Sequence, residues 1–331
     1  MNITFVVDGE EESGSPTFRS WAAEHVHRLR ADFAVVSELG FHDGNVPAIT
    51  SSLRGIVSLH IEVETGHGEL LAGNFAGAVQ NPANALAHVL AGLVDRNGRI
   101  TIPGVLDDVA ALDPAVRTSL AATPFDAPAF RRSAGVTSFG DPRWSVLESR
   151  TGRPALDVNG LHAGFTGPGP KAVIPARASA KVSIRLVPNQ IPERVAHLVV
   201  EHLKRAAPPD THIRTTIELL SPPTRMDAEH PAISAALAAL RTSFEREPVQ
   251  LHGGGSLPVL GVMTETLGLP VMSMGFMQPG SNEHAPNEWL LEDNFERGTR
   301  AIALFCAELG ASGRPSPEAS PSPHDVDRDR S

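Results

Sequence analysis

Apolar residues form two kinds of strand pattern along the chain. The first is an unbroken apolar run, found in ITFVV (3–7), FAVVS (33–37) and PVMSM (270–274). Unbroken runs of this length are typical of parallel strands covered on both faces. The three runs lie toward the two ends of the chain, and they predict a buried parallel sheet built from both.

The second pattern alternates between apolar and polar residues. It is strict in VSLHIEV (57–63), where the apolar residues point one way and His60 and Glu62 the other. KVSIRL (181–186) and HIRTTIEL (212–219) follow the same pattern, the last less strictly. Alternation predicts strands of a sheet that buries only one face.

Helices are predicted between these strands. Ser15-Pro16 is typical of a helix start and predicts a helix to about Arg30, and Asn81-Pro82 repeats the signal. Apolar stripes at helical spacing predict these inward-facing sets: Leu86, Val89, Leu90 and Leu93; Val195, Leu198, Val199 and Leu203; Ile233, Leu237, Leu240 and Phe244; Ile302, Phe305 and Leu309. Gly310 is expected just beyond the end of the last helix.

The order of these elements predicts an α/β domain that is interrupted by a smaller α+β domain. The expected boundaries are 1–55 and 222–310 for the α/β domain, and 56–221 for an inserted β–α–β–β–α–β unit of the ferredoxin-like kind. Within the insertion, the stretch 97–152 gives no clear pattern. Residues 311–331 are rich in Pro, Ser and charge, which predicts a disordered tail.

Composition narrows the class of protein. The net charge of −10 argues against a nucleic-acid or anionic-membrane partner, because both favour a basic surface. A single cysteine, Cys306, excludes a disulfide framework and suits a reducing compartment. No apolar stretch reaches the ~20 residues needed to span a bilayer, and the first residues lack a secretory pattern. We therefore expect a cytoplasmic protein.

Chemistry is suggested first by VVDGEEESGSP (6–16), where three acidic residues follow an apolar run. Neighbouring side chains at an extended strand end point to opposite sides, so Glu11 and Glu12 could divide two tasks, one binding a cation and one reaching past it. The alternative is a solvated acidic turn before a helix, where the helix dipole favours anions. The motif alone leaves both interpretations open.

Two further residues favour a metal site. Glu38 ends the run FAVVSE, and His284 lies in the polar loop SNEHAPNE (281–288) shortly after PVMSMGF. Open α/β sheets place their sites at strand carboxyl ends. Carboxylates together with an imidazole are the ligands that a zinc or manganese ion uses. A lone loop histidine is more often a simple surface residue.

These segments, with several others, resemble a known family. The acidic turn and the HAPNE loop are joined by LRG (53–55), GNFAGAVQNPANAL (73–86), GRITIPGVLDDV (98–109), KAVIPARASAKVSIRLVP (171–188) and HGGGSLPV (252–259). Together they resemble the dinuclear zinc metallopeptidases that include carnosinase-like dipeptidases, acetylornithine deacetylase and succinyl-diaminopimelate desuccinylase. The resemblance covers residues 1–310 in order and is closest to the dipeptidase branch.

The resemblance implies roles for individual residues. Glu11 would be the general base, and Glu12, Glu38 and His284 would be metal ligands. Arg185 would hold the carboxylate of the substrate, with Gly255 and Ser256 lining the pocket. The alternative for Arg185 is a plain exposed arginine.

It also implies an activity and an assembly. A metal-activated water would hydrolyse a peptide or N-acyl amide bond, with zinc as the metal and manganese or cobalt as alternatives. The α/β parts would form the catalytic domain. The insertion 56–221 would form a lid through which two copies dimerise, and Arg185 would reach the site of the second copy.

The chain departs from the family pattern in its metal ligands. The family's first metal-binding histidine and its bridging aspartate precede the acidic turn, which here begins at Asp8. We therefore expect one metal ion or none, and a first strand with an uncovered edge or face. Leu71 replaces the lid histidine of the family, and His67 is a possible substitute. A catalytically inactive, dimerising relative and a C-terminal fragment of a longer peptidase stay open as alternatives.

Overall fold

The computed structural model describes residues 1–66, 68–137 and 140–311, and the predicted tail beyond Ala311 lies outside this range. Contacts between residues divide the chain into two units. The first contains Met1–Ser51, Met226–Gln250 and the residues from Val262 onward, and the second contains Ser52–Arg225 and Leu251–Gly261. Strands β2 (Ala48–Leu53) and β10 (Val249–Gly253) and helix α9 (Pro258–Glu265) have residues in both units.

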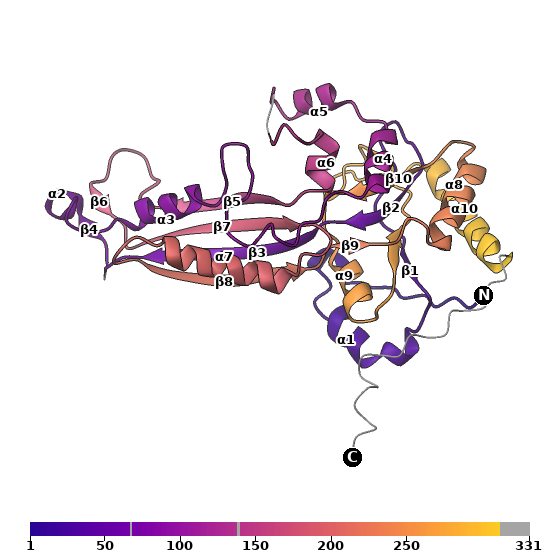
Figure 1. The fold of residues 1–331 in the computed structure, drawn as a ribbon, viewed down its shortest axis with the longest axis horizontal. Coiled ribbons are helices and arrows are strands. Elements are labelled where there is room, and N and C mark those ends of the chain that lie inside the picture. Colours follow the sequence, from indigo (N-terminus) through magenta and orange to yellow (C-terminus); the bar gives the residue numbers. More distant parts are fainter. Residues whose placement is uncertain (67, 138–139, 312–331) are drawn as a thin grey trace, which may run out of the picture. The chain divides into compact units, whose positions relative to one another are not determined.

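The second unit is built on a four-stranded antiparallel sheet (Figure 1). Its strands are β3 (Gly55–Glu64), β5 (Ala155–Ala163), β7 (Arg177–Leu186) and β8 (His212–Ser221), in the order β5-β7-β3-β8. With helices α3 (Pro82–Ala91) and α7 (Pro192–Ala206), the chain order is β–α–β–β–α–β. The predicted ferredoxin-like unit is therefore confirmed.

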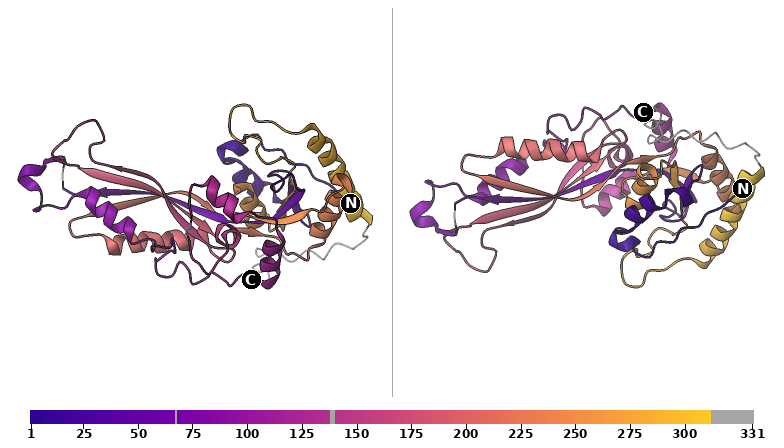
Figure 2. Two further views of the ribbon diagram at one scale, coloured as in Figure 1. Left: turned by 90° about the horizontal axis from the view of Figure 1, so that it is seen from above. Right: turned by 90° about the horizontal axis from the view of Figure 1, so that it is seen from below.

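The alternating pattern of β3 explains how this sheet is covered. Val57, Leu59, Ile61 and Val63 are fully buried, whereas the residues between them are half-buried. The buried residues pack with α3 and α7 in one apolar core, and Figure 2 shows both helices along the same side of the sheet. One face of the sheet is thus dry, as the alternation predicts.

Helix α3 begins where its sequence signal predicts. The side chain of Asn81 accepts a hydrogen bond of 2.8 Å from the backbone N–H of Ala83, and Pro82 occupies the first helical turn, where its missing N–H costs nothing. The buried residues Leu86 and Val89 then face the sheet. The start signal and the apolar stripe agree, and this helix is confirmed.

The stretch without a clear pattern contains three short helices, α4 (Pro114–Ala122), α5 (Ala127–Ser133) and α6 (Val146–Thr151). Ser145 and Glu148 form a reciprocal capping box at the start of α6. The unit also contains a two-stranded antiparallel sheet of β4 (Leu70–Leu71) and β6 (Val173–Ile174), next to the short helix α2 (Ala72–Phe75). Strand β9 (Thr224–Arg225) pairs with the end of β2.

The first unit has much shorter strands. β1 (Ala34–Val36) runs parallel to β11 (Val271–Ser273), as the two apolar runs predict, and β11 pairs in antiparallel fashion with β2. Helices α8 (Pro231–Phe244) and α10 (Glu292–Ala311) contribute Leu240 and Phe305 to the core of this unit. Gly310 lies within α10 rather than beyond its end.

The prediction of a first buried strand is wrong. Residues 1–7 are all described, and they are irregular and exposed, with Val7 93% exposed. A strand needs a partner for its backbone N–H and C=O groups, and within the described residues no strand pairs with this segment. Instead of a strand with an uncovered edge, these residues form an exposed segment that is not paired with any described strand.

The helix expected from Ser15 to Arg30 is also shorter than predicted. Helix α1 spans Phe18–Glu24, and a short 3-10 helix, Val26–Arg28, follows it. Ser15 has a φ of +51°, which is incompatible with the extended backbone of a helix N-cap, and its hydroxyl donates a hydrogen bond to the Asp8 carboxylate instead of capping the helix.

Among the helices in the described ranges, none combines the length and the apolar character that a membrane span requires.

Candidate functional site

The acidic turn is closed by its own first residue. The Asp8 carboxylate accepts a hydrogen bond of 2.9 Å from the backbone N–H of Glu10 and one of 2.6 Å from the Ser15 hydroxyl. These bonds, the Ser15 bond first, hold the pKa of Asp8 below its usual range. Between them, Glu11–Ser13 form a single 3-10 turn, and Gly14 has a φ of +82°, which suits glycine. The expected extended strand end is therefore replaced by a tight turn.

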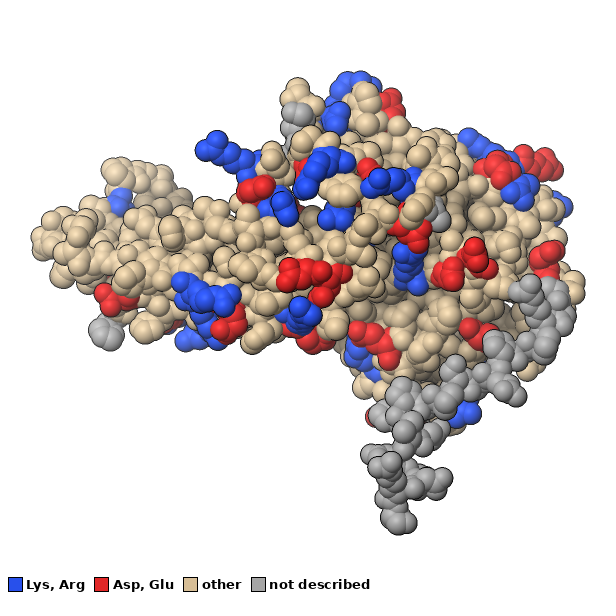
Figure 3. All heavy atoms as spheres, viewed as in Figure 1, with Lys and Arg blue, Asp and Glu red and all other residues tan. Residues whose placement is uncertain are grey.

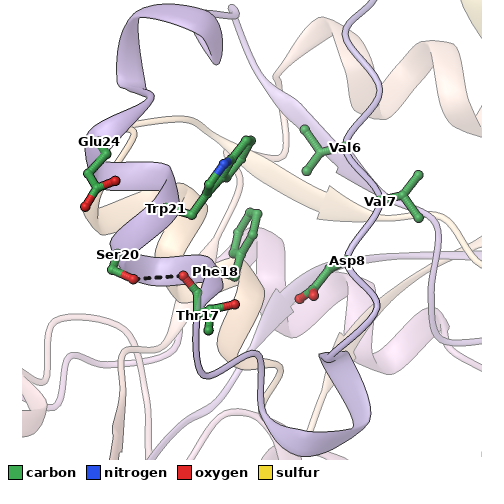
Figure 4. Close-up of a pocket in the computed structure, with 8 residues that line it drawn as sticks. All are labelled: Val6, Val7, Asp8, Thr17, Phe18, Ser20, Trp21 and Glu24. Atoms are coloured by element: carbon green, nitrogen blue, oxygen red, sulfur yellow. Dashed lines mark hydrogen bonds between the residues drawn. The ribbon is translucent and has the colours of Figure 1, made fainter.

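A pocket lies beside this turn, on its apolar side. It has a volume of about 310 Å³ and is lined by Val6, Val7 and Asp8 on one side and by Thr17, Phe18, Ser20, Trp21 and Glu24 on the other. In Figure 4 the rings of Phe18 and Trp21 extend from α1 toward Val6. None of the metal or catalytic residues predicted from the sequence lines this pocket.

The structure brings Glu12 and His284 into contact. His284 Nε2 lies 3.1 Å from Glu12 Oε2, and both side chains are 78% exposed. Glu38 follows β1, and its backbone carbonyl accepts a hydrogen bond from the Ser273 hydroxyl, which fixes this turn against β11. Glu11 and Glu38 are each partly buried.

The carboxylates near His284 repel one another. Burial, followed by the negative charges of Glu12 and Asp8, raises the pKa of Glu11. Burial, followed by the charges of Glu11 and Glu12, raises the pKa of Glu38 to about 7. His284 acts in the opposite direction on both. The group therefore holds more negative charge than one imidazole balances, and it favours a proton or a cation.

The donor set fits a divalent cation in its chemistry, because zinc accepts carboxylate oxygen and imidazole nitrogen. Its geometry is less complete: among the described residues, no three His, Cys, Asp or Glu side chains form a group that could hold a metal ion. Glu12 and His284 are in contact, and Glu38 affects the group through its charge. Glu12 and His284 could thus provide two ligands for a cation, but the described residues do not form a dinuclear centre.

The loop that carries His284 is fixed at its base by buried amides that the sequence interpretation missed. Gln278 is 4% exposed; its Nε2 donates to the carbonyl of Trp289 (2.8 Å), and its Oε1 accepts from the N–H of Leu291 (3.0 Å). The N–H of Trp289 donates to the carbonyl of Ser281. His284 itself has a φ of +58° at the tip. The available signal was a glutamine at the end of the apolar segment VMSMGFM (271–277).

A second amide pair supports the same loop from α10. Asn294 is fully buried, and its Nδ2 donates to the carbonyl of Phe276 at 2.9 Å. Asn294 and Asn45 also exchange hydrogen bonds of 3.2 Å. Because every buried donor and acceptor named here has a partner, the base of the loop is well defined.

In the second unit, the structure brings Arg185 and Ser256 together. Arg185 lies on β7, and its Nη1 donates to Ser256 Oγ at 2.8 Å. The Ser256 hydroxyl in turn donates to the backbone carbonyl of Arg54 at 2.6 Å. Gly255 is exposed, with open space beside its Cα. Arg185 is half-buried and hydrogen-bonded, so it is not a plain exposed arginine.

Arg54 belongs to the same group and was missed by the sequence interpretation. Its Nε donates to the carbonyl of Gly254 at 2.8 Å and its Nη1 to the carbonyl of Arg153 at 3.2 Å. Burial, followed by the positive charges of Arg185 and Arg150, lowers the pKa of Arg54 to about 10, and Asp157 opposes this change. The segment LRG (53–55) was the signal, but it carried no assigned role.

The close packing of this group requires a glycine at 254. A Cβ at this position would lie 2.5 Å from the carbonyl oxygen of Arg150 and 3.4 Å from Arg54 Nη2. Any side chain would therefore displace the turn. The backbone of residues 254–256 can approach the arginines because this glycine has no side chain.

The two remaining lid positions are Leu71 and His67. Leu71, which replaces the family's histidine, lies on β4 and is 57% exposed. His67 lies outside the described residues.

On the face drawn in Figure 3, described basic and acidic side chains are interspersed, without a continuous basic area.

Comparison with known proteins supports the resemblance seen in the motifs. Residues 51–211 match the family described as Peptidase dimerisation domain (M20_dimer). The human Beta-Ala-His dipeptidase is 29% identical over 317 residues, which are 93% of this chain and 62% of that enzyme. The Cys-Gly metallodipeptidase dug1 of Schizosaccharomyces pombe is 28% identical over 94% of this chain and 67% of its own length.

A solved structure agrees with the fold. The M20 family metallo-carboxypeptidase Sso-CP2 from Sulfolobus solfataricus has a TM-score of 0.80 and 28% identity, covering 90% of this chain and 68% of that chain. The predicted resemblance to the dipeptidase branch is confirmed. The chain spans less than two thirds of the length of the human relative.

Proposed function

We propose that this chain, which is similar to the M20 peptidases, takes part in the metal-dependent hydrolysis of a peptide or N-acyl amide bond in a small substrate with a free carboxylate. The observation that carries the proposal is the acidic group, in which Glu12 contacts His284 and both Glu11 and Glu38 have raised pKa values. The names of the human and yeast relatives support a dipeptide as the substrate class.

Within this proposal, Glu11 is the general base. A carboxylate with a raised pKa accepts a proton from water more readily than an ordinary glutamate, and it returns that proton to the leaving amine. Glu11 lies in the turn Glu11–Ser13, and its partly buried side chain stays accessible to solvent. Glu11 thus moves protons between water and the amine.

Glu12, Glu38 and His284 would hold the cation. Zinc is the first choice from the resemblance, with manganese or cobalt as alternatives, and the groups present favour a single ion. When bound, such an ion lowers the pKa of water and polarises a carbonyl group. The raised pKa of Glu38, about 7, means that its proton must be displaced before the carboxylate can act as a ligand at neutral pH.

Arg185 would bind the substrate carboxylate, with Gly255 and Ser256 beside it. A guanidinium binds a carboxylate through parallel N–H donors, and one donor of Arg185 already has a fixed direction toward Ser256. We also propose that two copies of the chain assemble through the dimerisation domain and that Arg185 serves the site of the second copy. A cytoplasmic location fits the single cysteine.

The test combines metal analysis with a hydrolysis panel. The full chain is loaded with zinc, its metal content is measured, and it is assayed with dipeptides and N-acyl amino acids. We expect bound zinc and turnover, and we expect Glu11→Gln to lower kcat by about 100-fold or more. Glu24→Gln, an exposed glutamate on α1, is the control and should leave the rate unchanged. A folded, dimeric chain without turnover would instead support the inactive relative.

A further inference from the structure

Arg54 contacts both ends of the turn that holds Arg185 in place. At one end, its Nε donates to the carbonyl of Gly254 (2.8 Å), and at the other, its backbone carbonyl accepts the hydroxyl of Ser256 (2.6 Å). Ser256 Oγ is also the acceptor for Arg185 Nη1 (2.8 Å). One residue therefore closes a hydrogen-bonded ring around Gly254–Ser256, and Arg185 is attached to that ring.

The guanidinium of Arg54 is suited to this task, and an ammonium group is not. It donates in two directions at once, to the carbonyls of Gly254 and Arg153. A guanidinium is a rigid, planar fork, whereas lysine presents a single flexible point charge. Substitution by lysine would keep the charge next to Arg185 and Arg150 but would lose one of these directions. Charge and geometry can thus be separated by experiment.

The charges around the turn support an anion as the ligand of the group. The positive charges of Arg185 and Arg150 act on Arg54, and the negative charge of Asp157 opposes them. Each described donor of Arg54 is directed at a backbone carbonyl, not at a carboxylate. A carboxylate that enters beside Arg185 would therefore meet positive charge that is only partly balanced.

We propose that Arg54 is a positioning residue, which clamps the Gly254–Ser256 turn so that the Ser256 hydroxyl holds Arg185 in the orientation that receives the carboxylate of the substrate. This inference rests on the proposed function of Arg185. Arg54 acts through Ser256 and does not itself contact the substrate. Its expected effect is on the preference for a free carboxylate, not on the rate of bond cleavage.

The first arm of the test measures ligand binding to the full chain by calorimetry. N-acetylglycine, which has a free carboxylate, is compared with N-acetylglycinamide, which lacks one. We expect Arg54→Lys to weaken N-acetylglycine binding about tenfold, the loss expected when an orienting hydrogen bond is removed, without changing binding of the amide. Arg214→Lys on β8, an exposed arginine paired with Glu62, is the matched control and should bind like the parent.

The second arm measures Arg185 directly, without a ligand. Hydrogen exchange at arginine side chains is followed by NMR on the chain labelled with ¹⁵N-arginine. We expect the Arg185 guanidinium to exchange faster in Arg54→Lys, with Ser256→Ala, which removes the acceptor of Arg185 itself, as the reference for a released Arg185. Arg54→Gln serves if Arg54→Lys does not fold. Unchanged Arg185 exchange in a folded variant overturns the inference.

The two arms separate the two proposals. If the parent chain binds the acid and the amide equally, Arg185 is not a carboxylate site and that part of the proposed function fails. Faster Arg185 exchange in the Arg54 variant would still support Arg54 as the residue that positions Arg185. Equal acid binding by parent and Arg54→Lys, in a parent that prefers the acid, contradicts the inference.

Discussion

The two candidate sites differ in how their charges are satisfied. In the second unit, Arg54, Arg185 and Ser256 are linked by hydrogen bonds that run from backbone to hydroxyl to guanidinium. In the first unit, Glu11 and Glu38 repel neighbouring carboxylates and have raised pKa values. The arginine group is therefore organised by the chain itself. The acidic group needs added positive charge, from protons or from a cation.

The supporting sheets show the same difference. The arginine group stands on β7, a ten-residue strand paired on both sides along its length. The acidic group stands beside β1, a three-residue strand, and beside an N-terminal segment that is exposed and unpaired. A site with hydrogen bonds already formed can bind without rearrangement, whereas the acidic site is expected to gain order when it gains charge.

The largest expected effect tests whether stability resides in the second unit. Leu59 lies at the centre of β3 and is fully buried, so Leu59→Ala should lower the free energy of unfolding by about 2–5 kcal/mol through lost burial and a cavity. Ile3→Ala in the exposed N-terminal segment should change it by less than about 0.5 kcal/mol. Urea denaturation measures both, and a loss at Ile3 comparable to that at Leu59 would contradict the comparison.

A medium effect is expected when the arginine group loses its central hydroxyl. Ser256→Ala leaves the carbonyl of Arg54 and one donor of Arg185 without this partner. The substitution should therefore lower the free energy of unfolding by about 1–3 kcal/mol. Ser20→Ala on α1 removes a hydroxyl that binds an exposed carbonyl, and it serves as the control with little expected change. A negligible loss at Ser256 would show that the ring adds no stability.

The smallest effect concerns pH and the acidic group. The folded-state pKa of Glu38, about 7, lies above its usual value of 4.5, so the folded state holds a proton that the unfolded state releases. The resulting stabilisation is complete below about pH 4.5 and is lost as the pH rises through 7. The Tm of the parent relative to Glu38→Gln should therefore fall over this range.

Glu247 provides a control of opposite sign for this measurement. A hydrogen bond from Arg241 lowers the pKa of Glu247 below its usual value. The Tm of the parent relative to Glu247→Gln should therefore rise with pH across the acidic range. Parallel curves for the Glu38 and Glu247 variants would contradict the assignment of a raised pKa to Glu38.

Much of the second unit could be predicted because its signals are local. The alternation in 57–63 fixes which face of β3 is buried, and Asn81-Pro82 marks the start of α3. The unbroken run at 3–7 looks the same as that at 33–37, yet only the second forms a strand. An apolar run indicates a tendency to be buried but does not identify the strand that pairs with it.

The candidate sites were predicted to different extents for a similar reason. Arg185 and Ser256 were suggested by motifs, and the structure places them in contact. Arg54 and Gln278 were missed because their partners are backbone groups, at Gly254, 200 residues away, and at Trp289, 11 residues away. Such contacts depend on the path of the chain and leave no spacing pattern in the sequence. The metal roles of Glu12, Glu38 and His284 stay predictions.

The loop that carries His284 has a further consequence. Its two ends are joined by Gln278, whose amide forms hydrogen bonds with the backbone of Trp289 and Leu291. The side chains between, at 282–287, play no part in that join. Residues at this tip can therefore be substituted, by evolution or by design, without breaking the hydrogen bonds at the base of the loop. New side chains would then face Glu12 from an unchanged scaffold.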